Sequence, residues 1–295
     1  MRGPRQVVLA GLALLAGLLA APAALAANPF GNWAVIIVAG DWRAHDGGPS
    51  QAFDNARRDL AKAFVADGFS PANISQFSAW PATPPPTQTT PIRKPGRRHA
   101  AQTAAAAAPA TPPPDAGPAP LKADGEVIFD ELSRLTRQAP DGCLIYLTSH
   151  GNPEGVQVGD GLLPPGALGE MVDRTCGDRP TVAIISACFS GVFVPALDGP
   201  NRMVLTAARP DRASFGCGQS DRYTYFDGCV LQSLAHVRDF AALAPAATAC
   251  VSRKETETHA APASEPQTKI GGELGLVLPL YAFAAPAPAS GDHRP

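Results

Sequence analysis

The sequence predicts an α/β fold whose mostly parallel sheet has about six strands and carries helices on both faces. Short apolar runs rich in Val, Ile, Leu and Tyr stand at 33–39, 144–148 and 181–186. Runs of this length between turn residues are typical of strands buried on both faces. Helical patterns separate the runs, and a strand followed by a helix and a second strand favours parallel pairing with a right-handed connection.

Residues 1–26 are typical of a secretory signal peptide. Two arginines precede an apolar run from Val7 to about Ala20, and Ala24-Leu25-Ala26 has the small residues of a cleavage site. A membrane anchor is the alternative, but the uninterrupted run is shorter than the roughly 20 residues that a span needs. We therefore expect an exported protein, periplasmic or secreted, with no stable membrane span after signal removal.

Composition and motifs argue against several classes of function. The formal net charge is −2, and the loss of Arg2 and Arg5 with the signal peptide makes it −4. Because the net charge is negative, we expect no nucleic acid as a partner. The sequence has no CxxC or HxxxH spacing, no phosphate-binding Gly-Lys-Ser/Thr loop and no Gly-x-Ser-x-Gly elbow. We expect no metal and no cofactor, while the oligomeric state stays open.

A helix and a second strand are expected after the strand at 33–39. Apolar residues from Phe53 to Phe64 recur at helical spacing, with Ser50 as the expected N-cap and Gly68 as the stop. The next apolar run, at 74–77, predicts a strand.

The composition changes at residues 81–120, which are rich in Pro and contain an alanine tract. Such a segment buries too little apolar surface to offset chain entropy, so we expect a disordered insertion. The expected folded domain thus has a first part at 27–80 and a second part at 121–283, followed by a disordered Pro- and Ala-rich tail at 284–295.

The second part supplies the remaining elements of the fold. Apolar periodicity predicts a helix at 126–138 and a short strand at 203–207. Further helical patterns lie at 229–236 and 239–256, and an apolar run at 276–280 closes the domain.

Two strands of this sheet lead directly to reactive side chains. His150 follows the run at 144–148, and Cys188 follows the run at 181–186. Adjacent parallel strands would bring both to the carboxyl edge of the sheet, where α/β sheets bind ligands. A nearby imidazole can activate a thiol as a nucleophile. Taken singly, each residue is more often structural, but the pair together favours acyl transfer through a thioester.

The segments LTSHG, ending at Gly151, and IISAC, ending at Cys188, resemble the motifs of the legumain-like (asparaginyl endopeptidase, haemoglobinase) family of caspase-clan cysteine peptidases. The resemblance extends from VIIVAGDW through LTAARPDRASFGC and suggests a bacterial exported member. It implies a caspase-haemoglobinase three-layer sandwich. It also implies a Cys-His dyad in which Cys188 attacks the scissile carbonyl, the N–H groups of Cys188 and Gly151 hold the oxyanion, and His150 protonates the leaving amine.

The same resemblance implies which residues form the substrate pocket. The family builds part of the pocket, and places a polar residue that orients the catalytic His, in the loop after the first strand; this loop offers Asp41, Arg43, His45 and Asp46. Legumains of animals and plants have Glu immediately before Ala-Cys, where this chain has Ser186, so a preference for Asn is not implied. The substrate-binding candidates are Arg43, His45, Ser186, Ser214 and Asp227.

Six cysteines stand in the expected exported part of the chain, where disulfides persist. Cys143 and Cys176 precede two adjacent parallel strands, so they are expected to form a disulfide. Cys217 and Cys229 flank one loop and form the second expected pair. Cys188 then stays free as the nucleophile, and Cys250 is left single.

We therefore predict a cysteine endopeptidase that acts on peptide or protein substrates. Two alternatives of other classes stay open. A transpeptidase or transamidase would use the same thioester but accept an amine instead of water. A non-catalytic binding module on the same fold would fail to react with a probe for an active-site thiol.

Overall fold

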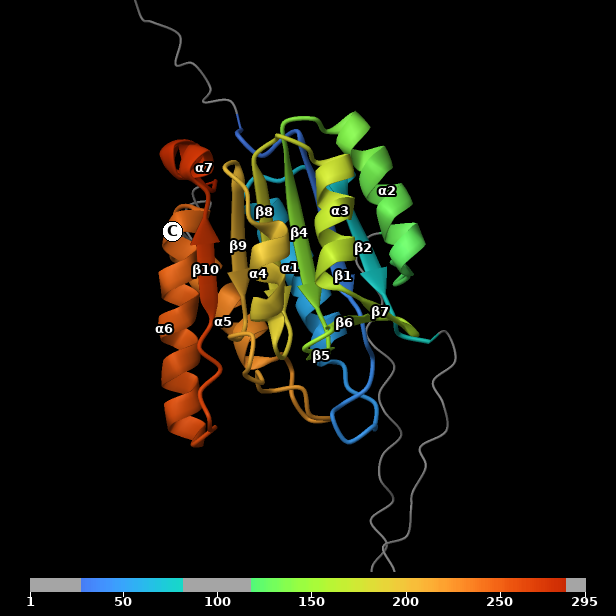
Figure 1. Ribbon diagram of the computed structural model, residues 1–295, viewed down its shortest axis with the longest axis vertical. Coiled ribbons are helices and arrows are strands. Elements are labelled where there is room, and N and C mark those ends of the chain that lie inside the picture. Colours follow the sequence, from blue (N-terminus) through green and yellow to red (C-terminus); the bar gives the residue numbers. More distant parts are fainter. Residues whose placement is uncertain (1–27, 82–117, 285–295) are drawn as a thin grey trace, which may run out of the picture.

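The computed structural model describes residues 28–81 and 118–284, and Figure 1 shows a central sheet with helices packed on both faces. The strands of this sheet run in the order β10-β9-β8-β4-β1-β2-β3. All neighbours are parallel except β10 and β9. The predicted α/β class is confirmed, with seven strands in place of about six. The strands are β1 (Trp33–Ala39), β2 (Ile74–Ser78), β3 (Leu121–Lys122), β4 (Gly142–Thr148), β8 (Thr181–Ser186), β9 (Arg202–Thr206) and β10 (Gln267–Ile270).

Three expected segments lie largely outside the described residues. The signal peptide expected at 1–26 lies wholly outside them. So does the insertion expected at 81–120, apart from Pro81 and residues 118–120, and the tail expected at 284–295, apart from Ala284. These three expectations stay predictions.

The helices form one layer on each face of the sheet (Figure 1). One layer holds α1 (Ala52–Ala66), α5 (Tyr225–Leu234) and α6 (Phe240–Thr258). The opposite layer holds α2 (Gly125–Gln138), α3 (Pro165–Thr175) and α4 (Val194–Leu197). The short helix α7 (Gly272–Val277) follows β10, and three 3₁₀ turns lie at Pro71–Asn73, Ser190–Phe193 and Leu278–Leu280.

Strand β1 explains why the sheet needs helices on both faces. All seven of its residues are buried. Because side chains alternate along a strand, successive residues enter opposite cores. Trp33, Val35 and Ile37 pack in the core on the α1, α5 and α6 side, whereas Ala34 and Ile36 pack in the core that α2 and α3 cover. The uninterrupted apolar run in the sequence is therefore the pattern of a central strand.

A second, small sheet stands in the Gly- and Pro-rich segment between β4 and α3, for which the sequence analysis predicted no strand. It consists of β5 (Gly151–Asn152), β6 (Gly155–Val158) and β7 (Gly161–Leu163), all antiparallel. Gly159 turns with φ +59°, and a Cβ at this position would lie 2.4 Å from the carbonyl oxygen of Ala123. The glycines that suppressed the strand pattern are thus the residues that allow this tight meander to pack against the main sheet.

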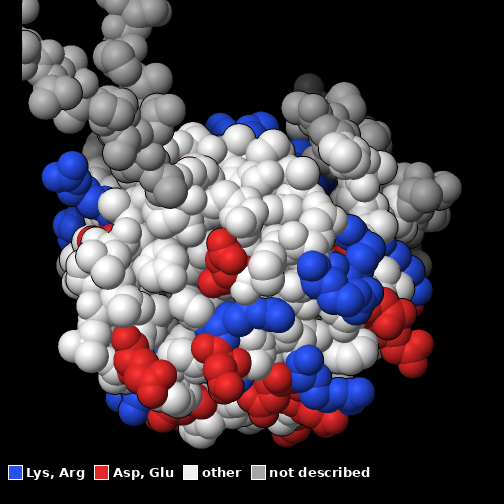
Figure 2. Space-filling model, turned by 90° about the horizontal axis from the view of Figure 1, so that it is seen from above, with Lys and Arg blue, Asp and Glu red and all other residues white. Residues whose placement is uncertain are grey.

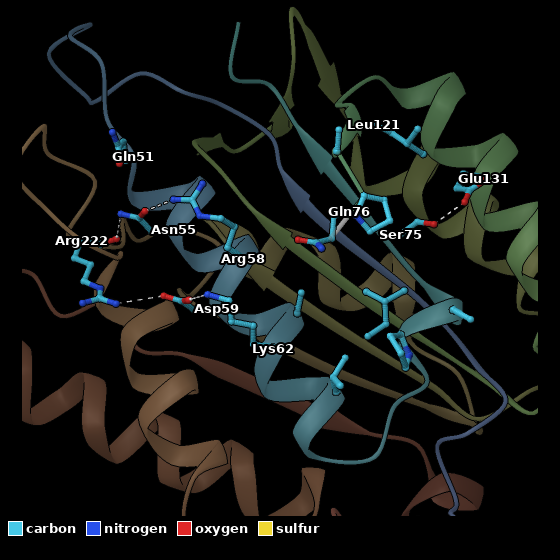
Figure 3. A pocket seen from close by; sticks show the side chains of 17 residues that line it. Gln51, Asn55, Arg58, Asp59, Lys62, Ser75, Gln76, Leu121, Glu131 and Arg222 are labelled. Atoms are coloured by element: carbon cyan, nitrogen blue, oxygen red, sulfur yellow. Dashed lines mark hydrogen bonds and ion pairs between the residues drawn. The ribbon is translucent and has the colours of Figure 1, made fainter. Parts of the chain in front are cut away.

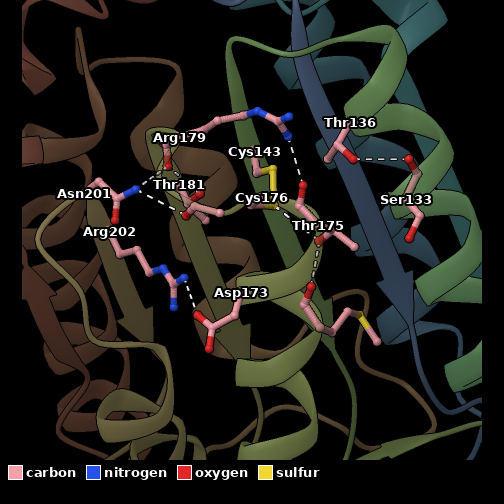
Figure 4. Close-up of a disulfide and its surroundings, with 12 residues drawn as sticks. Ser133, Thr136, Cys143, Asp173, Thr175, Cys176, Arg179, Thr181, Asn201 and Arg202 are labelled. Atoms are coloured by element: carbon pink, nitrogen blue, oxygen red, sulfur yellow. Dashed lines mark hydrogen bonds and ion pairs between the residues drawn. A yellow bond between two sulfur atoms is a disulfide. The ribbon is translucent and has the colours of Figure 1, made fainter.

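The disulfide between Cys143 and Cys176 joins the start of β4 to the end of α3, with the two Cα atoms 6.1 Å apart (Figure 4). This is the first expected pair. The second expected pair, Cys217 with Cys229, is wrong. Cys229 on α5 is bonded to Cys250 on α6, because these two helices pack side by side, and Cys217 is a free thiol.

Loss of the Cys143–Cys176 disulfide is expected to destabilise the fold markedly. The bridge closes a loop with a sequence separation of 33. Loop-closure entropy then predicts that the double variant Cys143→Ala/Cys176→Ala loses about 3.7 kcal/mol of unfolding free energy. Urea unfolding of the variant and of the wild type measures this difference. A loss below about 1 kcal/mol would show that the bridge does not constrain the unfolded chain.

Asp67, at the end of α1, makes stability depend on pH. Burial raises the pKa of its carboxyl group to about 7, and Oδ2 has no hydrogen-bond partner among the described residues. A raised pKa in the folded state means that this group favours folding below its unfolded pKa, and that this contribution is lost as the pH rises towards 7.

Asp67→Asn is therefore expected to stabilise the protein more at pH 8 than at pH 4. After an allowance for partial solvent screening, the change between these pH values is about 1–2 kcal/mol. Urea titrations at both pH values measure it. An equal effect of the substitution at the two pH values would contradict the shifted ionisation.

Surface charges of both signs are mixed on the face seen in Figure 2. Lys and Arg side chains are interspersed with Asp and Glu along the lower part of that view, and a broad area with few charged side chains lies above them. A mixed rim of this kind produces no strong field of one sign on this face.

Candidate active site

The register of two central strands brings His150 and Cys188 to the same edge of the sheet. β4 and β8 are adjacent and parallel, and their last residues, Thr148 and Ser186, are partners. The backbone N–H of Ser149 continues the pairing by donating to the carbonyl of Ser186 at 3.0 Å. His150 and Cys188 each stand two residues beyond these partners. The predicted juxtaposition of the two strand ends is therefore present.

The residue after the histidine lies directly against the backbone of the cysteine. A Cβ placed on Gly151 would come within 2.4 Å of the carbonyl oxygen of Cys188 and 3.0 Å of the Cβ of Ala187. Real Cβ atoms essentially never make such short contacts, so this position needs glycine. The chain segments that follow β4 and β8 lie so close together that small residues are needed between them, which explains the His-Gly and Ala-Cys pairs of the sequence.

Two groups from the N-terminal part of the chain hold the His150 ring. Its Nε2 atom lies 2.8 Å from the backbone carbonyl oxygen of Arg43. Because a carbonyl oxygen only accepts, Nε2 carries the proton, and Nδ1 of the neutral ring is left as the basic nitrogen. Phe53 of α1 meets the ring edge to face, with the centroids 5.1 Å apart. The sequence analysis expected a polar residue of this loop to orient the ring, but it indicated neither a backbone carbonyl nor Phe53 as the contact.

The loop that supplies this carbonyl is tied together by Asp41. Asp41 Oδ1 accepts from the backbone N–H of Trp42 at 2.7 Å and of Arg43 at 3.1 Å, and from Arg43 Nε at 2.9 Å. The Arg43 guanidinium therefore pairs with its own loop, and the bond to Asp41 raises its pKa. Arg43, an expected substrate contact, thus has its charge balanced in this structure.

Cys188 stands at a sharp turn out of β8. Phe189, the next residue, has φ 58°, a left-handed conformation that is uncommon outside glycine. Its N–H donates to the carbonyl of Arg212 at 2.7 Å. The Cys188 thiol accepts from the backbone N–H of Ser214 at 3.2 Å and is only partly buried. This turn takes the sulfur away from the sheet and places it beside Ser214, in the segment between β9 and α5.

Among the hydrogen bonds of the described residues, none joins Cys188 Sγ to the His150 ring. Catalytic hydrogen bonds are often long in unliganded enzymes and tighten when substrate binds, so their absence decides nothing about the pair. Within the same set of bonds, the backbone N–H of Cys188 has no acceptor, whereas the backbone N–H of Phe189 donates to the carbonyl of Arg212.

The second free thiol, Cys217, lies in the same neighbourhood. Its pKa is raised to about 11, chiefly by burial and then by the charge of Cys188, while the backbone N–H of His45 acts in the opposite direction. A thiol with a raised pKa is a weak nucleophile at neutral pH. His45, an expected substrate contact, has an exposed side chain.

Two other expected contacts, Ser186 and Asp227, lie beneath the surface. Their exposed fractions are 1% and 0%. The Asp227 carboxylate accepts from the hydroxyls of Tyr146, Thr148 and Thr224 at 2.6–2.8 Å, and Ser186 Oγ lies 3.3 Å from Thr224 Oγ1. Burial raises the pKa of Asp227, although these hydroxyls act to lower it. In this structure both residues are therefore part of a closed network under the strand ends.

The Tyr146 and Thr148 hydroxyls of this network were not singled out from the sequence. Both stand in β4, which the sequence analysis treated as an apolar run ending in a reactive residue. A tyrosine and a threonine on one face of a fully buried strand indicate a buried acceptor, because buried hydroxyls need partners. The two polar residues in the run at 144–148 could therefore have indicated the buried acceptor from the sequence.

A groove of about 970 Å³ lies apart from the dyad, between α1 and the strands β2 and β3 at one side of the sheet (Figure 3). Its lining includes ion pairs of Asp59 with Lys62 and Arg222, and a bond from Ser75 to Glu131. Neither Cys188 nor His150 lines it. The charges inside the groove are thus largely paired with one another.

Residues 28–81 and 118–284 contain no group of three or more His, Cys, Asp or Glu side chains arranged to hold a metal ion. In the same part of the chain, no helix combines the length and apolar character needed to cross a membrane.

Comparisons with known proteins agree with this geometry. Residues 121–244, which contain both His150 and Cys188, match the Peptidase C13 family. The fold is similar to that of caspase-1 from Spodoptera frugiperda, with a TM-score of 0.52 and 13% sequence identity over 82% of this chain and 87% of that chain. No curated protein matches the sequence. At this low identity the structural likeness establishes the fold alone, while the family match bears on the activity. Together they show a caspase-like fold and, over residues 121–244, similarity to the Peptidase C13 family, which indicates a cysteine peptidase.

Proposed function

We propose that Cys188 and His150 form the catalytic dyad of an endopeptidase that works through a thioester. The observation that carries the proposal is the β4–β8 register, which sets the two residues at equivalent positions beyond paired strand ends. The bond from Nε2 to the Arg43 carbonyl supports it, because it leaves Nδ1 of the neutral ring available for proton transfer.

In the proposed reaction, Cys188 Sγ adds to the scissile carbonyl carbon and its proton passes to His150 Nδ1. The carbonyl oxygen becomes an oxyanion, which the N–H groups of Cys188 and Gly151 stabilise. The C–N bond then breaks, and the proton on Nδ1 goes to the leaving amine. In deacylation, His150 takes a proton from water and the resulting hydroxide attacks the thioester carbon; the C–S bond then breaks, the proton returns from His150 to Sγ, and the acid product leaves.

The bond from the Ser214 N–H supports the role of the sulfur. The backbone N–H of Ser214 donates to the sulfur at 3.2 Å, and the carbonyl oxygen of Ser214 lies 3.5 Å from it, so Ser214 holds the sulfur in place from both sides of its own backbone. A contact between Ser214 and a substrate bound over Cys188 is part of this proposal, and the 3.7 Å distance from the Ser214 hydroxyl to the same sulfur supports it.

Hydrolysis and transfer to an amine share the thioester, so product analysis separates them. A peptide mixture with an added amine nucleophile is incubated with the wild type and with Cys188→Ala. Free carboxylic acid as the main product supports the peptidase, whereas amide with the added amine as the main product would make the chain a transamidase. Turnover that persists in Cys188→Ala would refute the dyad.

We also propose that the chain is exported. The apolar N-terminal segment and its small-residue cleavage site support this, and so do the two disulfides, since disulfides persist in oxidising compartments. N-terminal sequencing of protein from a cell fraction outside the cytoplasm tests it, with Ala27 as the expected first residue. Full-length chain confined to the cytoplasm would contradict export.

A further inference from the structure

We propose that Cys188 and Cys217 form a thiol pair, which hydrogen peroxide converts into a reversible disulfide. The chain has six cysteines, and four of them are paired in the two disulfides described above. The two free thiols come from segments 29 positions apart, yet both lie at the site of the proposed dyad and both are partly exposed. The proposal rests on the proposed function, because it takes Cys188 as the reactive thiol.

The segment between β9 and α5 brings Cys217 alongside Cys188. The Cys188 sulfur accepts from the N–H of Ser214 at 3.2 Å and lies 3.5 Å from the carbonyl oxygen of the same residue. Cys217 follows Ser214 by three residues. Between them the chain bends at Gly216, which has φ +89° and lies against Tyr225, so that a Cβ there would be 2.6 Å from the Tyr225 ring. The bend keeps Cys217 close to the nucleophile.

Hydrogen bonds fasten the residues after Cys217 to the loop that follows β1. Ser50 Oγ donates to the carbonyl of Gly218 at 2.9 Å, and Gln219 Nε2 donates to Asp46 Oδ2 at 2.9 Å. The same loop supplies the carbonyl that binds the imidazole of the proposed dyad. Cys217 therefore lies between the two segments that hold the sulfur and the imidazole of that dyad.

The two thiols differ in reactivity, which sets the order of the reaction. Burial, and then the charge of Cys188, raise the pKa of the Cys217 thiol to about 11. A thiol with a raised pKa reacts slowly with peroxide, so Cys188 is oxidised first. The part of the rise that comes from the charge of Cys188 is lost once that sulfur is a neutral sulfenic acid. Cys217 therefore becomes the better nucleophile when it is needed.

The proposed oxidation has two steps. The Cys188 sulfur attacks one oxygen of hydrogen peroxide, the O–O bond breaks, and the second oxygen leaves as water with the thiol proton, so that Cys188 becomes a sulfenic acid. The Cys217 sulfur then attacks the Cys188 sulfur, the S–O bond breaks, and the hydroxyl leaves as water with the Cys217 proton. The peroxide has accepted the two electrons that the two thiols have lost.

The disulfide would both inactivate the enzyme and protect it. A disulfide needs its two Cα atoms about 4.4–6.8 Å apart, and the glycine before Cys217 gives the backbone the freedom to reach that distance. While the bond exists, Cys188 cannot attack a substrate. A sulfenic acid without a neighbouring thiol is oxidised further to the irreversible sulfinic acid, whereas a disulfide is returned to two thiols by a dithiol reductant.

Non-reducing peptide mapping by tandem mass spectrometry tests the bond directly. The protein is treated with a mild reductant, which spares the two buried disulfides, and then with hydrogen peroxide. We expect a cross-linked pair of peptides that contain Cys188 and Cys217 in the wild type. In Cys188→Ala, Cys217 is expected to stay a thiol at the same dose. A wild type with Cys188 as sulfinic acid and Cys217 as a free thiol would overturn the proposal.

Recovery of peptide hydrolysis after oxidation gives a second readout, with Cys217→Ser as the matched variant. The serine hydroxyl is close in size to the thiol but cannot form a disulfide. Peroxide is expected to lower the rate of both proteins about 10-fold or more, after which dithiothreitol restores most of the wild-type rate but less than about one fifth of that of Cys217→Ser. Thermal unfolding verifies that the variant folds.

The outcomes separate this proposal from the proposed function. Hydrolysis that is lost in Cys188→Ala, with no cross-linked peptide in the oxidised wild type, would overturn the thiol pair alone. If the reduced wild type does not hydrolyse peptides, the proposed function fails, and the peptide map still decides whether the disulfide forms. Equal recovery of the wild type and Cys217→Ser would also contradict the thiol pair.

Discussion

Cys188→Ala is expected to abolish peptide hydrolysis, and His150→Ala to lower kcat/KM by about 10³-fold or more. Without the sulfur no acyl-enzyme forms, and without the imidazole neither the nucleophile nor the leaving amine has a proton partner. Initial rates on a fluorogenic peptide measure both effects. His150→Ala in particular should lower kcat, because its role lies in the chemical steps.

Cys217→Ala is the matched control for this pair. Cys217 is the other free thiol of the described chain and is partly buried like Cys188, but its raised pKa makes it a poor nucleophile. We expect this variant to keep activity within a few-fold of the wild type, with thermal unfolding used to verify that all variants fold. Activity retained by Cys188→Ala, or abolished by Cys217→Ala in a folded protein, would contradict the assignment of Cys188 as the nucleophile.

Asp227→Ala is expected to cause the largest loss of stability of any single substitution considered for this protein, about 3 kcal/mol. The change leaves the hydroxyls of Tyr146, Thr148 and Thr224 buried without their shared acceptor. Each unsatisfied buried group costs about 1–3 kcal/mol. Asp227→Asn should cost less, because the amide oxygen still accepts and burial already disfavours the charged carboxylate, as its raised pKa indicates.

Urea unfolding measures the Asp227 series, with Asp239→Ala as the comparison. Asp239 also accepts a hydrogen bond, from the N–H of Ala242 at the start of α6, but it does not connect three buried hydroxyls. Its removal is expected to cost about 1 kcal/mol, as for a helix cap. Equal losses for Asp227→Ala and Asp239→Ala would mean that the buried hydroxyls find other partners.

The central strands and the meeting of their ends could be predicted from sequence because one physical rule governs both. Strands buried on both faces are continuously apolar, as in β1, β4 and β8, and adjacent parallel strands end at one edge. The positions of His150 and Cys188 follow from that rule. The family motifs added the chemistry, and the Peptidase C13 match over residues 121–244 agrees with it.

The groups that orient the site could not be predicted, because they are backbone atoms or depend on packing between distant elements. The acceptor for His150 is the Arg43 carbonyl, and every residue type carries a carbonyl. The partner of Cys229 is set by the packing of α5 on α6, which sequence spacing does not encode. The meander β5–β7 was missed because the glycines that permit its turns also weaken the strand pattern.

Covalent labelling of Cys188 tests the thioester mechanism most directly. A peptidyl acyloxymethyl ketone forms a thioether with an active-site cysteine and releases its carboxylate, and tandem mass spectrometry of the digested protein locates the adduct. The mechanism predicts one adduct, on the peptide that contains Cys188, which disappears in Cys188→Ala and is strongly reduced in His150→Ala. An adduct on Cys217, or no adduct when Cys188 is demonstrably a free thiol, would contradict it.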